Sequence, residues 1–244
     1  MSTIRGARER ARIEVTAAIK DEARKQLAAE GAAKLSLRAV ARELGMVSSA
    51  LYRYFPSRDD LLTALIVDAY DAVGDVAEAA RGKSDDPAAT AHTARWTAVT
   101  CAVRGWALAH PHEYALIYGS PVPGYTAPQD TVGPASRVGQ VLIALVRDAH
   151  RADGLAVPPL AAELRPEAAR MAADLAPDLP PAVVASLVSA WAQLFGLISF
   201  ELFGQFNRVV EAREQLFRHA VHELGRSVGL LDGRTPARPG ATGA

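Results

Sequence analysis

The chain has 244 residues, and half of them are hydrophobic, which allows one large domain or two smaller ones with a sizeable core. Its net charge is zero, but residues 1–60 hold 12 Lys and Arg against 8 Asp and Glu, whereas the remainder holds 15 against 19. A basic N-terminal part before an acidic remainder favours a nucleic-acid partner for the first part only. Ala is abundant and alternating β-branched runs are absent, so we expect an all-α fold.

The cysteine content and the charged N-terminal residues argue for a cytoplasmic protein. Cys101 is the sole cysteine, so no internal disulfide can form, which suits a reducing cytosol. Charged residues at the N-terminus without an apolar core behind them argue against secretion.

We expect residues 1–6 to be loose, or alternatively to form a basic arm that touches DNA. A helix over about 7–30 should then bury one line of side chains: Ile13, Ala17, Ile19, Ala23 and Leu27.

Residues 35–62 are typical of two short helices joined by a glycine turn. Ser36 is a suitable N-cap for the first helix, and Gly45 supplies the left-handed conformation that closes it. The second helix should run from about 48 to 54 and end before Pro56. The expected buried positions are Val40, Ala41, Leu44, Leu51 and Phe55. Such a pair forms a helix-turn-helix, which lays its second helix in the DNA major groove.

The second short helix carries polar groups on its remaining face, at Ser48, Ser49, Tyr52, Arg53 and Tyr54. Hydroxyls, phenols and a guanidinium are the groups that contact phosphates and base edges. The alternative is an ordinary solvated helix face, on which two tyrosines beside an arginine are less expected. Tyr52 fits a phosphate contact or a core ring equally well.

The chain after Pro56 should form a helical body. Ser57 caps a helix to about residue 80, with Asp59 and Asp60 in its first turn. Residues 81–87 break this helix, and further helices are expected over about 88–110, 112–118, 131–152, 161–173, 179–200 and 207–230. We therefore expect a DNA-binding domain over 1–56, a helical ligand-binding and dimerisation domain over 57–230, and a disordered tail over 231–244.

The stretch Leu179–Phe200 contains no charged residue. It is long enough to span a bilayer, but two prolines and several polar residues favour a helix that is buried on all sides, by its own core and by a partner. We expect this helix and the last one to form a homodimer interface. The residues assigned to it are Val184, Leu187, Val188, Trp191, Leu194, Leu216, Ala220 and Leu224.

Large aromatic residues concentrate in the body, at Trp96, Trp106, Tyr114, Tyr118, Tyr125, Trp191 and Phe195. Ligand sites are mainly apolar with a few polar groups, and tyrosines supply both. Plain core packing is the alternative for each residue. Our hypothesis is that some of them line a cavity for a small apolar or aromatic effector.

Enzyme chemistry finds little support in the sequence. The pairs His110 with His112 and His219 with His222 lack the further ligands that complete a zinc site. Phosphate-loop, dinucleotide and serine-nucleophile motifs are absent. We predict no enzyme activity, no metal and no cofactor.

The motifs Leu37-Arg-Ala-Val-Ala-Arg-Glu-Leu-Gly45 and Ala50-Leu-Tyr-Arg-Tyr-Phe-Pro-Ser-Arg-Asp-Asp-Leu-Leu62 resemble the N-terminal domain of the TetR family of bacterial transcriptional regulators. The match covers about residues 10–66. The body is similar to one subgroup through Trp106-Ala-Leu-Ala-His-Pro111, Tyr114 and Gly119-Ser-Pro-Val-Pro-Gly-Tyr125. This second match is looser.

The resemblance implies a cytoplasmic, nucleoid-associated homodimer, usually a repressor that a small ligand releases from its DNA operator. By position it assigns base contacts to Ser48, Ser49, Ala50 and Arg53, and phosphate contacts to Tyr52 and Tyr54. Ser36 and Arg38 fall near the DNA backbone, with a base contact as the alternative for Arg38, and Arg58 is assigned to the DNA-binding residues. Many members have His and Lys where this chain has Tyr54 and Arg58, which bears on operator choice. The alternative is a helical ligand-binding or interaction protein without specific DNA recognition.

Overall fold

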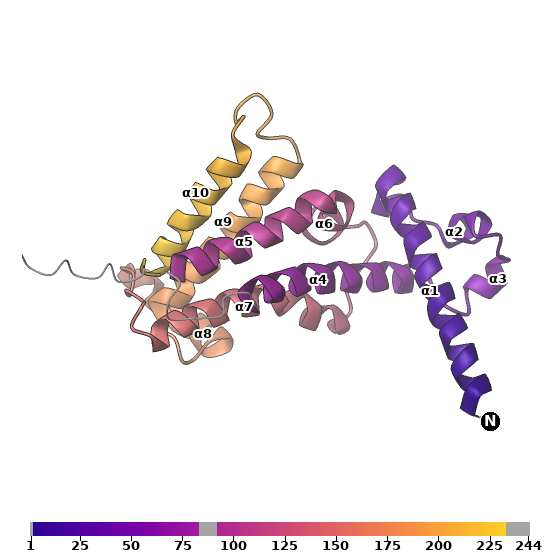
Figure 1. The fold of residues 1–244 in the computed structure, drawn as a ribbon, viewed down its shortest axis with the longest axis horizontal. Coiled ribbons are helices and arrows are strands. Elements are labelled where there is room, and N and C mark those ends of the chain that lie inside the picture. Colours follow the sequence, from indigo (N-terminus) through magenta and orange to yellow (C-terminus); the bar gives the residue numbers. More distant parts are fainter. Residues whose placement is uncertain (1, 83–91, 233–244) are drawn as a thin grey trace, which may run out of the picture. The chain divides into compact units, whose positions relative to one another are not determined.

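The computed structural model describes residues 2–82 and 92–232, and these ranges are built from helices (Figure 1). The α-helices are α1 (Ser2–Glu30), α2 (Leu37–Glu43), α3 (Ser48–Leu51), α4 (Arg58–Gly82), α5 (His92–Ala109), α6 (Pro111–Tyr118), α7 (Val132–Arg151), α8 (Arg165–Leu175), α9 (Pro181–Leu202) and α10 (Arg213–Val228). Short 3-10 helices are η1 (Ala32–Lys34), η2 (Gln129–Thr131) and η3 (Ala162–Leu164). The described ranges contain no strand, only an isolated bridge between Leu155 and Leu230. The predicted all-α fold is confirmed.

The described residues divide into two compact units. The first unit comprises the chain up to Gly74 together with Ala107–Arg137, and the second comprises Asp75–Trp106 with the residues from Val138 onward. The first unit therefore contains α1, α2, α3, most of α4, and α6 with its following loop. We predicted a domain boundary after residue 56, with all later helices in the second domain. The compact units instead group α6 with the N-terminal helices.

The core of the first unit is the predicted helix-turn-helix core. Ile19, Ala23 and Leu27 of α1 pack with Leu51, Phe55 and the apolar side of α2 and α4. Ala41 is 1% exposed, as expected where two helices cross closely. Each fully buried Leu or Ile contributes about 1.5–3 kcal/mol through its removal from water. These contacts hold α2 and α3 on the bracing helix α1.

The start of α1 differs from the prediction. The helix begins at Ser2, so the expectation of a loose stretch is wrong for residues 2–6, while Met1 lies outside the described residues. Ile13 is 60% exposed and Ala17 is exposed, so the buried line does not extend to them. The reason is that the first turns of α1 run past the helices it braces, as Figure 1 shows within this unit. Arg and Ala are good helix formers, and over residues 7–12 they form exposed turns of this helix.

Several other boundaries also differ. Helix α3 ends at Leu51 and continues to Phe55 as turns, α8 runs to Leu175, and α10 begins at Arg213 rather than near 207. The tail prediction is wrong for its first residues, because the Leu231 N–H donates to the Gly154 carbonyl at 3.0 Å and Asp232 accepts a hydrogen bond from Thr93. The rest of the predicted tail and most of the predicted break over 81–87 lie outside the described residues.

The second unit packs α5, α7, α8, α9 and α10 around buried apolar side chains. Trp96 of α5 is fully buried, and its indole N–H donates to the Val221 carbonyl of α10 at 2.8 Å. Gly225 lets α10 approach this ring, since a Cβ there would lie 3.0 Å from the indole. Arg104 makes two hydrogen bonds with Glu201, of 2.8 and 2.6 Å, which join α5 to α9.

The uncharged helix α9 is the one described helix that is long and apolar enough to cross a membrane. That finding is weak, because a core helix of a soluble protein passes the same test. One face of α9 is buried in the second unit through Val183, Leu187, Leu194 and Ile198. Trp191 is 43% exposed and lies three residues from the partly buried Val188, so the two form an open apolar strip along one side of α9. Phe200 is 52% exposed but lies nine residues from Trp191, about half a turn round the helix.

Candidate nucleic-acid interface

The turn between α2 and α3 has the geometry that its sequence predicts. The Ser36 hydroxyl accepts a hydrogen bond from the Ala39 N–H at 3.4 Å and so caps α2. Gly45 has a φ of 64°, which is the left-handed region that a residue with a side chain rarely adopts. The Met46 N–H then donates to the Ala41 carbonyl at 2.8 Å, which closes the end of α2. The chain re-enters a helix at Ser48, with the extended residue Val47 as its N-cap.

The polar side chains of α3 and its following turns lie on the side away from the core. Ser49 and Arg53 are exposed, Tyr52 is 42% exposed, and Ser48 and Ala50 are partly buried. Tyr54 is also partly buried and packs against the core of the unit. The Arg53 guanidinium makes no hydrogen bond or ion pair with any described residue. This surface combines hydroxyls, a phenol and a guanidinium with few internal partners, a combination suited to hydrogen bonds with phosphates and base edges.

Arg58 has a different environment from Arg53. Its guanidinium donates to the carbonyls of Leu35 at 3.1 Å, Ala32 at 2.7 Å and Ala33 at 3.3 Å. It therefore ties the start of α4 to η1 and to the start of the helix-turn-helix. We predicted from its position in the motif that Arg58 contacts DNA. Nothing in the sequence indicated this internal role.

Ser36 and Arg38 lie at the start of α2. Ser36 is partly buried, and its N–H donates to the Gln26 side chain at 3.4 Å. Arg38 is exposed. The cap function of Ser36 is thus visible in the structure, while contacts of either residue with the DNA backbone stay predictions.

An ion-pair network ties the bracing helix α1 to α4 and α6 within the first unit. Asp68 of α4 accepts Lys20 at 2.7 Å and Arg24 at 2.5 Å, and Arg24 also lies 3.9 Å from Glu113 of α6. These side chains are roughly a quarter to a third exposed, so each pair contributes about 0–1 kcal/mol. The network matters mainly for orientation, because it fixes α1 to two helices at once.

The Ser57 cap of α4 is confirmed. Its hydroxyl accepts the Asp60 N–H at 3.1 Å and donates to the Asp60 carboxylate at 2.7 Å. Asp59 and Asp60 lie in the first turn of α4, where the helix dipole favours negative charge. The start of α4 is therefore fixed by its own side chains and by Arg58.

The aromatic residues predicted to bind an effector fall into separate groups. In the first unit the rings of Tyr114 and Tyr118 lie 5.1 Å apart, and Tyr70, which the prediction missed, lies 5.9 Å from Tyr118. Burial raises the pKa of the Tyr118 phenol far above its ordinary value. The Tyr125 hydroxyl shares a hydrogen bond of 2.9 Å with Thr63.

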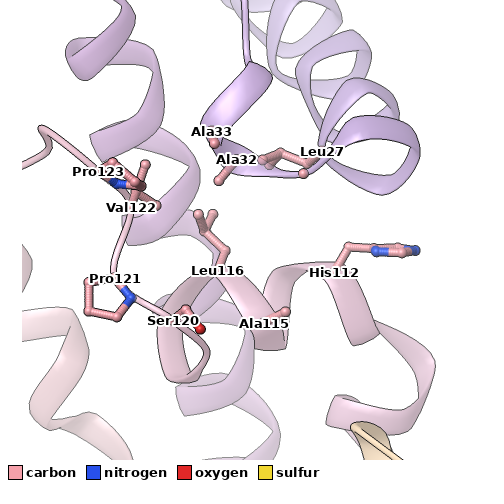
Figure 2. Close-up of a pocket in the computed structure, with 11 residues that line it drawn as sticks. Leu27, Ala32, Ala33, His112, Ala115, Leu116, Ser120, Pro121, Val122 and Pro123 are labelled. Carbon is pink, nitrogen blue, oxygen red and sulfur yellow. The ribbon is translucent and has the colours of Figure 1, made fainter.

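The other predicted aromatics belong to the second unit. Trp96 is a core residue, Trp106 is 6% exposed, and Trp191 pairs with Phe195 at a ring distance of 5.9 Å. A cavity in the first unit is lined by none of the predicted aromatics (Figure 2). Aliphatic and proline side chains form most of its lining, so a search for clustered aromatics could not find it.

The residues predicted at the dimer interface also divide by burial. Val184, Leu187, Leu194 and Leu224 are at most 8% exposed and belong to the core of their own unit. Val188 and Ala220 are partly buried, and Trp191 and Leu216 are 43% and 38% exposed. Only the last four residues have surface left for a partner. Helical spacing alone did not separate the α9 residues, because Leu187, Trp191 and Leu194 follow one another at three- and four-residue spacing on one side of the helix.

Two family models match the chain. The model for bacterial regulatory proteins of the tetR family matches residues 19–65, which span the helix-turn-helix. The model for the C-terminal domain of tetracyclin repressor-like proteins matches residues 96–224, more than half of the chain. Together they cover the helix-turn-helix and most of the helices of the second unit.

Known relatives agree with these matches. The chain is 44% identical to the HTH-type transcriptional regulators Rv1816 of Mycobacterium tuberculosis and Mb1846 of Mycobacterium bovis, over 82% of this chain and 86% of each relative. A crystal structure of the proposed regulatory protein SCO4313 is 35% identical, with a TM-score of 0.72 over 88% of this chain and 97% of that one. A Rhodococcus sp. RHA1 protein of unknown function, 22% identical over 88% and 95% of the two chains, shares the fold with a TM-score of 0.67.

These matches indicate a transcriptional regulator and not an enzyme, and such a family implies a soluble protein of the cytoplasm. Regulators of this kind bind DNA operators, dimerise and respond to small molecules. The helix-turn-helix, the family models and the relatives lead to one conclusion: the chain belongs to the TetR family of bacterial transcriptional regulators.

Proposed function

We propose that this regulator is a nucleoid-associated repressor that binds a pseudo-palindromic operator as a homodimer and is released from it by a small apolar or aromatic effector. The observation that carries the DNA part is the exposed polar surface of α3 and of the turns that follow it, where Arg53 has no described partner. An arginine that folding leaves unpaired at the end of a recognition helix is suited to the bidentate contact with guanine.

The individual contacts follow from exposure and chemistry. Arg53 reads a base edge, and Ser48, Ser49 and Ala50 lie alongside bases at the start of the same helix. Tyr52 and Tyr54 contact phosphates through their hydroxyls, and Arg38 approaches the DNA backbone. Ser36 supports α2 as its cap, and Arg58 positions η1 through the carbonyls it binds. Arg58 is thus a positioning residue in this proposal.

The homodimer uses the open strip of the second unit. Trp191 of the strip on α9 and Leu216 of α10 are large apolar side chains that the protomer leaves exposed. Exposed apolar patches of this kind mark protein interfaces. A two-fold pair of these strips would bring two copies of α3 to one duplex, as helix-turn-helix dimers require.

The effector part rests on the aromatic groups. The tyrosines around Tyr118 offer apolar rings and phenol hydroxyls together, which favours an aromatic ligand. An effector can release DNA only by its differential affinity for two conformations of the protein. A panel of small aromatic compounds should therefore raise the melting temperature and weaken DNA binding together. If no compound changes either quantity, the effector part is wrong.

Selection of bound DNA from a random pool tests the DNA part. We expect two inverted half-sites whose centres lie about one helical turn, roughly 10 base pairs, apart or a multiple of it. Gel-shifts of the selected DNA should weaken steeply as salt is raised, since phosphate contacts release counterions. Failure to enrich any sequence, with no retardation at low salt, would favour a helical ligand-binding or interaction protein without specific DNA recognition.

A further inference from the structure

A half-open cavity of about 440 Å³ lies at the surface of the first unit (Figure 2). Its walls are the end of α1 with η1, helix α6, and the loop that follows α6. In Figure 2, Leu116 of α6 points toward Ala32 and Ala33 of η1, while Val122 closes the side formed by the loop. Small-molecule sites in proteins have volumes of about 300–1,000 Å³, so the cavity has the size of a ligand site.

The lining is mainly apolar and carries two polar side chains. Leu27, Leu116, Val122 and the loop prolines supply the apolar surface. His112 and Ser120 are exposed residues of its lining, and neither side chain makes a hydrogen bond with any described residue; in Figure 2 the His112 imidazole extends away from Leu116. An apolar hollow with a small number of unengaged polar groups is the usual chemistry of a small-molecule site.

The loop that forms one wall is held in place by specific contacts. A Cβ on Gly119 would lie 2.2 Å from the Ala115 carbonyl oxygen, so only glycine fits where α6 ends. Gly124 has a φ of 77°, and the Tyr125 N–H donates to the Val122 carbonyl at 3.1 Å. The hydrogen bond between Tyr125 and Thr63 ties the loop to α4. These contacts fix the shape of the loop that forms one wall of the cavity.

The opposite wall is part of the anchor of the DNA-reading helices. Ala32 and Ala33 line the cavity, and their carbonyls are the ones that Arg58 binds. The same guanidinium holds the Leu35 carbonyl directly before α2. A molecule that wedges between α6 and η1 would press on these carbonyls and change the hold of Arg58 on the helix-turn-helix.

We propose that this cavity binds a small, mainly apolar molecule with one hydrogen-bonding group, and that its occupancy weakens DNA binding through η1. None of the aromatics assigned to the effector lines it, so it is a second ligand site beside the proposed one. The binding half of this inference is independent of the proposed function. The regulatory half rests on the chain being a DNA-binding regulator.

Disulfide tethering tests the binding half without a known ligand. Cys101 is first replaced by alanine, and a single thiol is then introduced by Ser120→Cys at the cavity edge. The control is Ala109→Cys, an exposed position of the first unit outside the cavity. Each protein is equilibrated with equal amounts of bis(2-phenylethyl) disulfide and bis(2-hydroxyethyl) disulfide in excess 2-mercaptoethanol, and the adducts are quantified by intact-protein mass spectrometry.

The phenylethyl adduct should be favoured about tenfold more at Ser120→Cys than at Ala109→Cys, because only the cavity removes the phenyl group from water. Adding Ala115→Phe, which fills the cavity from α6, should abolish this preference. Pro123→Cys on the same loop gives a second labelling site if the first variant fails to fold. Equal adduct ratios at the cavity and control positions would overturn the binding half.

The regulatory half is tested with the two adducts of Ser120→Cys and the selected operator DNA. We expect the phenylethyl adduct to bind the operator about fivefold or more weakly than the hydroxyethyl adduct, the lower range of typical couplings between sites. Equal operator affinities would overturn the regulatory half. If the unlabelled protein binds no selected DNA, the proposed function fails, while the adduct ratio still decides the binding half because it is measured without DNA.

Discussion

Two arginines of the first unit that lie close in sequence differ in their surroundings, and this difference separates a proposed DNA contact from a structural role. Arg53 is exposed and has no described partner, while Arg58 donates to three backbone carbonyls. Both carry the same charge and both fall in the motif that resembles the family. Removing each should therefore affect a different quantity, DNA affinity for Arg53 and folding stability for Arg58.

Arg53→Ala should weaken operator binding by about 1–3 kcal/mol and relax the preference at one base position, because a bidentate base contact is lost. Stability should not change, since the side chain has no internal partner. Fluorescence anisotropy with the selected operator and its single-base variants measures both effects. Arg170→Ala, an exposed arginine of the second unit, is the matched control and should leave affinity unchanged. Wild-type affinity and site preference in Arg53→Ala would refute base readout.

Arg58→Ala should lower the free energy of unfolding by about 1–3 kcal/mol, because the carbonyls of Ala32 and Leu35 lose their charged donor. Arg58→Lys should restore only part of the loss, since an ammonium group cannot reproduce the planar fork. Urea unfolding monitored by circular dichroism gives both values. Unchanged stability with weakened DNA binding would instead make Arg58 a direct DNA contact.

At the scale of elements, the loop after α6 depends on one close approach. Gly119→Ala should destabilise the protein by about 1–3 kcal/mol, because its Cβ would overlap the Ala115 carbonyl oxygen. Gly105→Ala in α5 is the matched control, since its Cβ meets nothing within 4 Å and alanine is favoured in a helix by up to about 1 kcal/mol. The two changes should shift the melting temperature in opposite directions. If both changes lower the melting temperature equally, the overlap with the Ala115 carbonyl oxygen is not the cause of the loss at Gly119.

The helices were predictable because their signals are local. Ser36, Gly45 and Ser57 each fix a helix end through contacts within a few residues, and the structure has these ends as expected. Helix α3 ends earlier than predicted, since its last residues continue as turns that no sequence signal distinguishes from a helix. Local chemistry therefore predicts where a helix starts better than where a short one ends.

The candidate sites were less predictable because they depend on tertiary contacts. From helical spacing alone, Ser49 could be placed on the outer face of α3, and Arg53 on the same side of the turns that follow it. The carbonyls that engage Arg58 lie more than twenty residues before it in the chain, and nothing in the sequence marks them. Likewise, Trp191 and Leu194 lie three residues apart on the same side of α9, so spacing could not tell Leu194, which is buried, from Trp191, which is exposed.

At the scale of the whole molecule, the open apolar strip of the second unit should decide the oligomeric state. Trp191→Glu should weaken the dimer by about 2 kcal/mol or more, roughly thirtyfold in dissociation constant, because a large aromatic anchor is replaced by a charge. Sedimentation velocity over a dilution series measures this constant. Leu175→Glu on α8, at an equally exposed apolar position outside the strip, should leave it unchanged. Equal dissociation constants for Trp191→Glu and wild type would exclude the strip as the interface.

The composition of the first unit has a consequence for building chimeric regulators. Leu116, Ile117, Val122 and Tyr125 pack against its helix-turn-helix core, although they follow that core by fifty residues or more in the chain. A transplant that ends after residue 56 would carry the reading helices into a new host but leave part of their hydrophobic support behind. An exchange of DNA specificity between relatives should therefore move Ala107–Arg137 together with the N-terminal residues up to Gly74, as two inserts rather than one.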